Sequence, residues 1–143
     1  MKLGIVVAKF NSEITSIGLD AAKEKAKKLG LNIINVIEVF GAFDSPLAVS
    51  ALFNSPEIDA VIVIGAIIKG ETKHDEAIAF TTLKTLQELS LQFNKPIGLA
   101  ISGPGMTYEQ AVKRAKPIAE NAVEAVKMLY LKEIEEENKT RIM

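Results

Sequence analysis

The sequence lacks cysteine and tryptophan and has one histidine among 143 residues. Without cysteine there is no disulfide framework and no thiolate metal site, and one histidine excludes a histidine-rich metal site. We therefore expect no metal and no metal-dependent catalysis. The sequence also lacks an excess of charge of one sign, because its 17 Lys and Arg residues are balanced by 18 Asp and Glu residues. Nucleic-acid binding therefore has little electrostatic support.

Long hydrophobic runs are also missing, since no stretch approaches the roughly 20 apolar residues of a membrane span. The apolar start ends at Lys9 without the cleavage pattern of a signal peptide, so it is interpreted as a first strand. We expect a cytoplasmic protein without membrane contacts. Hydrophobic residues still make up 48% of the chain. Because surplus apolar surface usually lies in a subunit interface, we expect a homo-oligomer.

Short apolar runs alternate with longer helical patterns along the chain. The runs are rich in valine and isoleucine and lack polar alternation, which is typical of buried parallel strands. They are Leu3 to Ala8, Ile33 to Val39, Ala60 to Ile68 and Ile97 to Ile101. Their alternation with helices predicts one domain over residues 1–143 with a three-layer, doubly wound, flavodoxin-like α/β fold: a four-stranded parallel sheet with helices on both faces.

The last helix has a clear start and an ambiguous end. Thr107 followed by Gln110 is typical of a capping box. Small residues on one stripe permit close packing; the expected stripe is Ala111, Ala115, Ile118, Ala122, Ala125 and Leu129. Pro117 is expected to kink or divide this helix. The charged stretch 133–143 is expected to be a frayed helix end or a solvated tail.

The loops that leave the carboxyl ends of the strands carry the unusual residues, and ligands bind at that edge of an open parallel sheet. We expect all four loops to meet there; in chain order they are Phe10-Asn11, Gly41 to Asp44, Gly70 to His74 and Ser102 to Thr107. Phe10 and Phe43 are aromatic at loop positions, so either a neighbouring subunit or helix covers them, or a flat ring ligand stacks on one. Asp44 is either a helix N-terminal charge or a hydroxyl-binding carboxylate.

The third of these loops, Gly70 to Glu76, directly follows an apolar strand, opens a long helix and holds the only histidine. A helix N-terminus presents unpaired N–H groups and partial positive charge, so phosphate can bind there beside an imidazole. Thr72 followed by Asp75 also fits a capping box. The segment is therefore either a purely structural helix start or a phosphate site.

Taken together, these segments resemble the 6,7-dimethyl-8-ribityllumazine synthase family. The resemblance covers nearly the whole chain and rests on Phe10-Asn11, Gly41 to Ala48, Gly65 to His74 and Glu109 to Ala115, in order and at compatible spacing. The Ser102 to Thr107 loop is similar to the archaeal-type branch. The resemblance implies the doubly wound fold expected above. It also implies pentamers, in some members joined into sixty-subunit icosahedral capsids, with sites between adjacent subunits.

The resemblance implies a transferase for the penultimate step of riboflavin biosynthesis. It condenses 5-amino-6-(D-ribitylamino)uracil with 3,4-dihydroxy-2-butanone 4-phosphate to 6,7-dimethyl-8-ribityllumazine, releasing phosphate and water without a cofactor. One alternative is the related archaeal pentameric riboflavin synthase, which joins two lumazines; the intact phosphate loop argues against it. Another is a non-catalytic shell-forming or flavin-binding protein.

Site residues follow from the resemblance by position. His74 is implied to transfer protons, and Glu71 and Thr72 to hold phosphate through backbone N–H groups, helped by the partner subunit's Arg114. The residues implied to line the pyrimidine and ribityl sites are Phe10, Ala42, Phe43, Asp44, Ala66, Ile67, Ile68 and Leu99. Phe10 would stack on the pyrimidine and Asp44 would accept hydrogen bonds from ribityl hydroxyls.

The sequence departs from the family in two places. Leu99 stands where many members have a phenylalanine facing the neighbouring site, so simple apolar contact is expected there. Lysines that many members carry after the arginine are replaced around Ile118 and Ala122. We therefore expect Arg114 to be more important for phosphate binding in this chain.

Overall fold

A computed structural model describes residues 1–142 of the chain. Its sheet has four parallel strands in the order β2-β1-β3-β4. The strands are β1 (Lys2–Ala8), β2 (Asn32–Val39), β3 (Ala60–Ile68) and β4 (Ile97–Met106). The helices are α1 (Ser12–Lys28), α2 (Ser45–Phe53), α3 (His74–Phe93) and α4 (Tyr108–Ile142), with a short 3₁₀ helix η1 (Ala42–Asp44) before α2.

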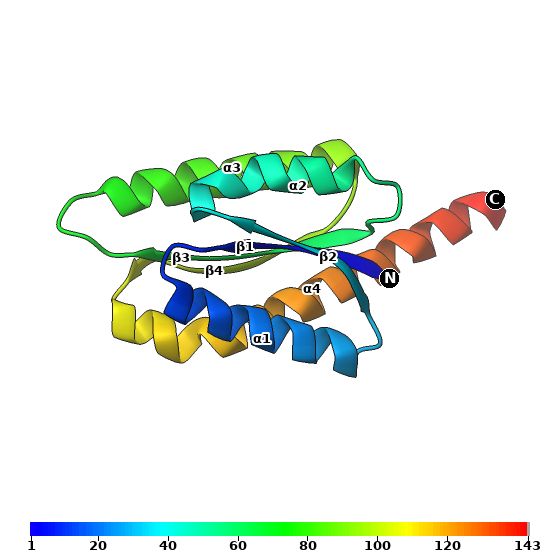
Figure 1. Ribbon diagram of the computed structural model, residues 1–143. Helices are drawn as coiled ribbons and strands as arrows, with labels where there is room; N and C mark the ends of the chain where they lie inside the picture. The colour runs from blue at the N-terminus through cyan, green and yellow to red at the C-terminus, as the bar shows by residue number, and fades with distance from the viewer. Residues whose placement is uncertain (143) are drawn as a thin grey trace.

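The helices form a layer on each face of the sheet, which confirms the predicted flavodoxin-like α/β fold. Helices α1 and α4 cover one face and α2 and α3 cover the other (Figure 1). One core lies between β1, β3 and the α1–α4 pair, and a second lies beneath α2 and α3. Strands β1 and β3 are buried on both faces, as their unbroken valine and isoleucine runs predicted.

Strand β2 is not the buried strand that the sequence predicted. It lies at one edge of the sheet, and its Ile34 and Val36 side chains are exposed, at 43% and 40%. A register shift between Leu3 and Gly4 in its pairing with β1 interrupts the regular alternation of the two faces. An apolar run reports strand propensity, whereas exposure depends on whether a strand is central or at an edge.

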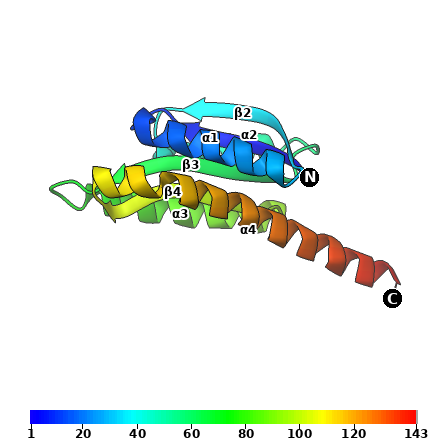
Figure 2. The ribbon, with the colours of Figure 1, turned by 90° about the horizontal axis from the view of Figure 1, so that it is seen from below.

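Helix α4 is longer and more continuous than the sequence indicated. It runs as one helix of 35 residues past Pro117 to Ile142, so the charged segment after residue 132 continues the helix, and Met143 lies outside the described residues. Figure 2 shows its C-terminal half extending beyond the sheet. Packing on β4 and α1 offsets the one backbone hydrogen bond that Pro117 removes.

The buried face of α4 differs from the predicted stripe at its C-terminal end. Ala125 and Leu129 are exposed, whereas Val123 and Val126 are buried in the core beneath the helix. Small residues still permit close packing, since a Cβ built on Gly98 of β4 would lie 2.6 Å from the Ala122 carbonyl oxygen. Because glycine has no Cβ, Gly98 lets the helix and the strand approach this closely.

Strand β4 continues beyond its expected end at Ile101. The Gly-Pro-Gly sequence at 103–105 is typical of a turn, and Gly103 and Gly105 do have positive φ values, of 104° and 79°. Pairing with β3 nevertheless resumes after an irregularity, where Ile68 lies opposite Met106. The predicted Ser102 to Thr107 loop is therefore mostly an irregular strand end that lies against β3.

No helix in the part of the chain that the structure describes is both long enough and apolar enough to cross a membrane.

Candidate active site

A cleft of about 670 Å³ lies at the carboxyl ends of β1, β2 and β3. Its volume is in the range of small-molecule sites, and its position is the one expected for ligands of an open parallel sheet. Three of the four predicted loops supply its walls, together with the first turns of α3. The cleft is lined by Phe10, Asn11, Phe40, Gly41, Ala42, Phe43, Asp44, Ala66, Ile67, Ile68, Lys69, Gly70, Thr72, His74, Asp75 and Ile78.

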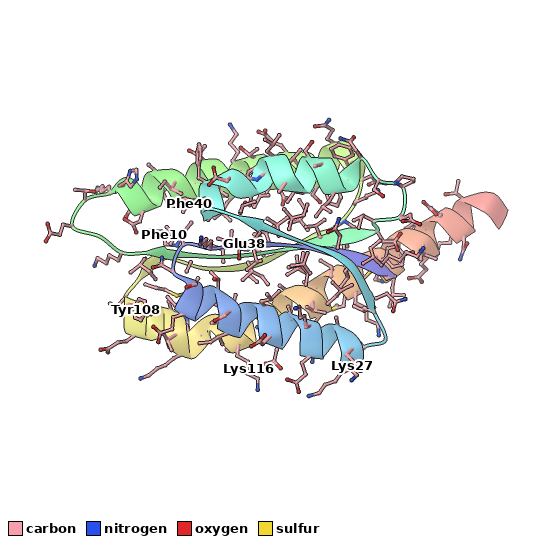
Figure 3. The ribbon with its side chains drawn as sticks, viewed as in Figure 1. Phe10, Lys27, Glu38, Phe40, Tyr108 and Lys116 are labelled. Carbon is pink, nitrogen blue, oxygen red and sulfur yellow. The ribbon has the colours of Figure 1, made fainter. Side chains whose placement is uncertain are left out.

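Aromatic rings form the mouth of the cleft. The Phe10 and Phe40 rings lie against each other, with centroids 6.1 Å apart, at the end of the sheet from which both loops leave (Figure 3). The Phe10 backbone N–H donates to the Phe40 carbonyl oxygen at 2.8 Å, which holds the two loops together. Phe10, Phe40 and Phe43 are all more than half exposed. Flat apolar surface is therefore available to a ring ligand.

Asn11 ties the first loop to the floor of the cleft. Its backbone adopts the left-handed conformation, with φ 62° and ψ 47°, immediately before α1. This turn directs its side-chain amide towards β3, where Nδ2 donates to the Ala66 carbonyl oxygen at 3.2 Å. Asparagine suits both tasks, because it tolerates a positive φ and carries a donor. The Phe10 ring thereby gains a fixed position relative to β3.

Asp44 performs the structural role that the sequence suggested, and it also faces the cleft. Its Oδ2 atom accepts a hydrogen bond from the Gly41 backbone N–H at 3.0 Å, and the residue stands at the N-cap of α2. Buried Ser45 donates to the Ala42 carbonyl oxygen at 2.7 Å and fixes the same turn. A carboxylate has several acceptor sites, so Asp44 can also accept a hydrogen bond from a ligand hydroxyl.

The loop between β3 and α3 is exposed and leads into the helix at His74 (Figure 1). The predicted capping box is wrong: the N-cap is Lys73, and Thr72 Oγ1 instead accepts a hydrogen bond from the His74 backbone N–H at 3.3 Å. With Lys73 as the N-cap, the third residue of the helix is Glu76, so Asp75 stands one position too early to complete a capping box. The first turn of α3 lies at the cleft with Lys69 in the same wall, an arrangement suited to an anion.

The irregular end of β4 supports this loop from behind. Lys69 N–H donates to the Met106 carbonyl oxygen at 2.8 Å, and Gly105 N–H donates to Asp75 Oδ2 at 3.4 Å. A Cβ added to Gly103 would lie 2.0 Å from the Ile67 carbonyl oxygen, so only glycine permits this approach. The fourth loop thus contributes by holding the third loop in place.

A hydrogen bond joins the N-termini of α1 and α4, which follow the carboxyl ends of β1 and β4. The Tyr108 hydroxyl donates a hydrogen bond to Glu13 Oε2, and this bond raises the pKa of the Tyr108 phenol above its ordinary value. The predicted capping box of α4 is confirmed. Thr107 N–H donates to Gln110 Oε1 at 3.0 Å, and Gln110 N–H donates to Thr107 Oγ1 at 3.2 Å. Helix α4 therefore begins at a fixed point beside the cleft.

Comparison with known proteins identifies the family. The sequence model of 6,7-dimethyl-8-ribityllumazine synthase matches residues 1–133. The chain belongs to this family.

Relatives bearing the name 6,7-dimethyl-8-ribityllumazine synthase are similar over most of their length. The one from Metallosphaera sedula is 51% identical over 129 residues, covering 90% of this chain and 85% of the relative. The one from Saccharolobus solfataricus is 47% identical over 144 residues, covering 95% of this chain and 94% of the relative. The one from Staphylothermus marinus is 45% identical over 139 residues, covering 96% of this chain and 93% of the relative. The expected archaeal relationship is thus confirmed.

Most residues that the lumazine synthase resemblance selected lie together at the cleft. They are Phe10, Ala42, Phe43, Asp44, Ala66, Ile67, Ile68, Thr72 and His74. Sequence reasoning missed Phe40 and Ile78 as cleft residues, and it did not assign a site role to Lys69. Each had a signal. Phe40 is an aromatic residue beside the selected Gly41, Lys69 is the cation that precedes the phosphate loop, and Ile78 is one helical turn after His74.

Three selected residues do not line the cleft. Glu71 lies exposed on the loop, Arg114 is exposed on α4, and Leu99 is 44% exposed on the outer strand β4. Ile118 and Ala122, where many lumazine synthases have lysines, pack in the core between α4 and the sheet. Lys69 is the cation in the wall of the cleft.

Proposed function

We propose that this chain condenses 5-amino-6-(D-ribitylamino)uracil with 3,4-dihydroxy-2-butanone 4-phosphate to 6,7-dimethyl-8-ribityllumazine. The observation that carries the proposal is the composition of one cleft. Exposed aromatic rings, the Asp44 carboxylate and a helix start with the only histidine of the chain lie around a space of about 670 Å³. Family membership, with relatives of about half identical sequence, supports the same reaction.

The cleft divides the work between its two ends. Phe10 stacks on the pyrimidine, Asp44 accepts hydrogen bonds from ribityl hydroxyls, and the β3 end at Ala66 to Ile68 contacts the edge of the ring. At the other end, the backbone N–H groups of Glu71 and Thr72 bind the phosphate. Lys69 adds positive charge beside it. Two substrates held side by side in this way react as if in one molecule.

His74 transfers protons between the bound substrates. The amine adds to the ketone carbonyl and water leaves to give an imine. Phosphate is then eliminated, the second amine closes the ring, and a second water leaves. Each step moves a proton, and an imidazole serves as acid and base near neutral pH. Neither oxidation nor reduction occurs, so the reaction needs no cofactor, and no metal takes part.

The working form is a homo-oligomer with sites between adjacent subunits. Arg114 and Leu99 lie away from the cleft of their own subunit, and exposed apolar side chains surround its mouth. In the assembly, the partner subunit's Arg114 completes the phosphate site and the partner subunit's Leu99 makes apolar contact with the ring. The assembly is a pentamer, alone or as part of a sixty-subunit capsid, and sedimentation of the purified protein distinguishes these forms.

The whole chain acts as one domain, residues 1–143, in which the charged C-terminal segment extends α4. The family match over residues 1–133 supports a single unit. The protein works in the cytoplasm on two small molecules, without nucleic-acid or membrane partners.

The test is to incubate purified protein with both substrates and follow the fluorescent lumazine and the released phosphate. Equal amounts of the two products are expected. The same protein supplied with lumazine alone should form no riboflavin, which separates this activity from that of a riboflavin synthase. A folded protein that forms neither product would instead be a shell-forming or flavin-binding protein.

A further inference from the structure

Asp75 is a charged, buried residue in the wall of the cleft. Its exposure is 8%, and it is the only charged residue among the buried residues that the structure describes. Carboxylates are rarely buried without a partner, because removal from water is costly unless hydrogen bonds replace the hydration. The position of Asp75 on the first turn of α3, directly after His74, therefore needs an explanation beyond helix capping.

The partner of Asp75 lies on another element. Its Oδ2 atom accepts the backbone N–H of Gly105, 30 residues further along the chain at the end of β4, at 3.4 Å. The N-cap of α3 makes no side-chain capping hydrogen bond. Gly105 has a φ of 79°, and a positive φ of this kind is adopted readily by glycine. The Gly105 N–H thus faces α3 through a backbone turn that favours glycine.

A second hydrogen bond lies beside the first and holds the other end of the same loop. The Lys69 N–H donates to the Met106 carbonyl oxygen at 2.8 Å. The loop between β3 and α3 is therefore anchored at both ends on two consecutive residues of β4. Between these anchors, Glu71, Thr72 and His74 are all exposed.

We propose that Asp75 is a positioning residue that holds the phosphate loop and His74 over the cleft by accepting the Gly105 N–H. The inference rests on the proposed function for its substrate and extends it to a residue with no assigned role. Asp75 acts through the loop and touches no reacting atom. Removing its acceptor oxygen lets the start of α3 move away from β4, and His74 and the phosphate-binding N–H groups move with it.

Three matched variants test this role by steady-state kinetics. Asp75→Ala removes the acceptor, Asp75→Asn keeps an acceptor oxygen but removes the charge, and Glu76→Gln removes a neighbouring exposed charge at the same helix end. For Asp75→Ala we expect kcat to fall and KM for the phosphate substrate to rise, together lowering kcat/KM by roughly 10- to 100-fold. KM for the uracil substrate should stay within about twofold. Asp75→Asn should recover most of the loss, and Glu76→Gln should resemble the wild type.

Three kinetic outcomes overturn the proposal. The first is wild-type kinetics in Asp75→Ala. The second is an Asp75→Asn variant as impaired as Asp75→Ala, because the charge would then matter and the hydrogen bond would not. The third is a parallel rise in KM for the uracil substrate, since that indicates a general distortion of the cleft.

Hydrogen exchange provides a readout that needs no activity. In the wild type, the Gly105 amide should exchange slowly, and Asp75→Asn should retain much of that protection. An unprotected Gly105 amide in the folded wild-type protein overturns the proposal, even if Asp75→Ala does not fold. If the wild type forms no lumazine but Gly105 is protected, the proposed function fails and the anchoring of the loop stands.

Discussion

The rings of Phe10 and Phe40 lie with their centroids 6.1 Å apart and their planes tilted by 35°. They follow two neighbouring parallel strands, β1 and β2, and both line the cleft although they remain largely exposed, at 59% and 72%. Exposed rings of this size are unfavourable in water, and their pairing covers only part of their surface. We therefore propose Phe40, beside Phe10, as a second surface for the pyrimidine ring.

We predict that Phe40→Ala weakens binding of the uracil substrate. Loss of an aromatic contact worth about 0.5–1.5 kcal/mol should raise KM for that substrate by roughly 2- to 12-fold, with KM for the phosphate substrate unchanged. Leu91→Ala provides the control, because Leu91 is a similarly exposed apolar residue, at 74%, near the other end of α3. Equal effects of the two substitutions would contradict a role for Phe40 at the site.

We predict that Gly103→Ala destabilises the fold. The added Cβ would lie 2.0 Å from the Ile67 carbonyl oxygen, and φ at this position is 104°. The backbone therefore has to move to accommodate the methyl group. We expect the free energy of unfolding, measured by urea denaturation, to fall by at least about 2 kcal/mol. The control is Gly70→Ala, where nothing lies within 4 Å, and its change should stay within about 0.5 kcal/mol. A stable Gly103→Ala variant would mean that β4 does not support β3 as described.

The bond between Tyr108 and Glu13 predicts an alkaline titration. The hydrogen bond to Glu13 raises the pKa of Tyr108, so the protonated phenol is favoured in the folded state. Its stabilising contribution is therefore present below the ordinary tyrosine pKa of about 10 and is lost as pH rises through the higher folded value.

Absorbance of tyrosinate measures this titration cleanly, because the chain has two tyrosines and no tryptophan. In a Tyr130→Phe background, Tyr108 should ionise above pH of about 10, and Glu13→Gln should move its midpoint down. A midpoint that Glu13→Gln leaves in place would show that the two side chains do not interact in solution.

The sequence predicted the central part of the fold better than its edges. The strands β1 and β3 are buried on both faces, so their composition alone identifies them. The exposure of Ile34 and Val36 was missed because the amino acids of a strand do not state whether it lies at an edge. The Gly-Pro-Gly segment of β4 has the composition of a turn, and only pairing with β3 keeps it in the sheet.

In the candidate site, too, the sequence predicted features within one segment better than contacts between distant segments. Residues of single loops, such as Phe43, Asp44 and His74, line the cleft, as expected for loops that follow the strands of a parallel sheet. Their roles in binding and catalysis stay predictions. Asp75 was interpreted as part of a local capping box, since its partner Gly105 is 30 residues away in the chain. Arg114 is exposed and does not line the cleft, so the phosphate-binding role proposed for it requires a contact between subunits, which one chain does not contain.

The proposed sharing of sites between adjacent subunits predicts complementation between inactive variants. In that arrangement His74→Ala would remove the proton-transfer group of one subunit, and Arg114→Ala would remove the cation supplied by its neighbour. Mixed assemblies contain some sites with an intact His74 from one subunit and an intact Arg114 from the other. We expect the two variants, unfolded and refolded together, to recover a fraction of wild-type activity. Refolding each variant alone is the control, and a mixture no more active than the separate variants would place both residues in the same subunit.

The central claim is that His74 transfers protons at a lumazine-forming site, and the rate of lumazine formation tests it most directly. With both substrates saturating, wild-type protein should form fluorescent lumazine, and His74→Ala, with an unchanged sedimentation profile and unfolding curve, should reduce kcat by roughly 10²- to 10⁴-fold. Contradiction would come from folded wild-type protein that forms no lumazine, or from a His74→Ala variant that forms it at the wild-type rate.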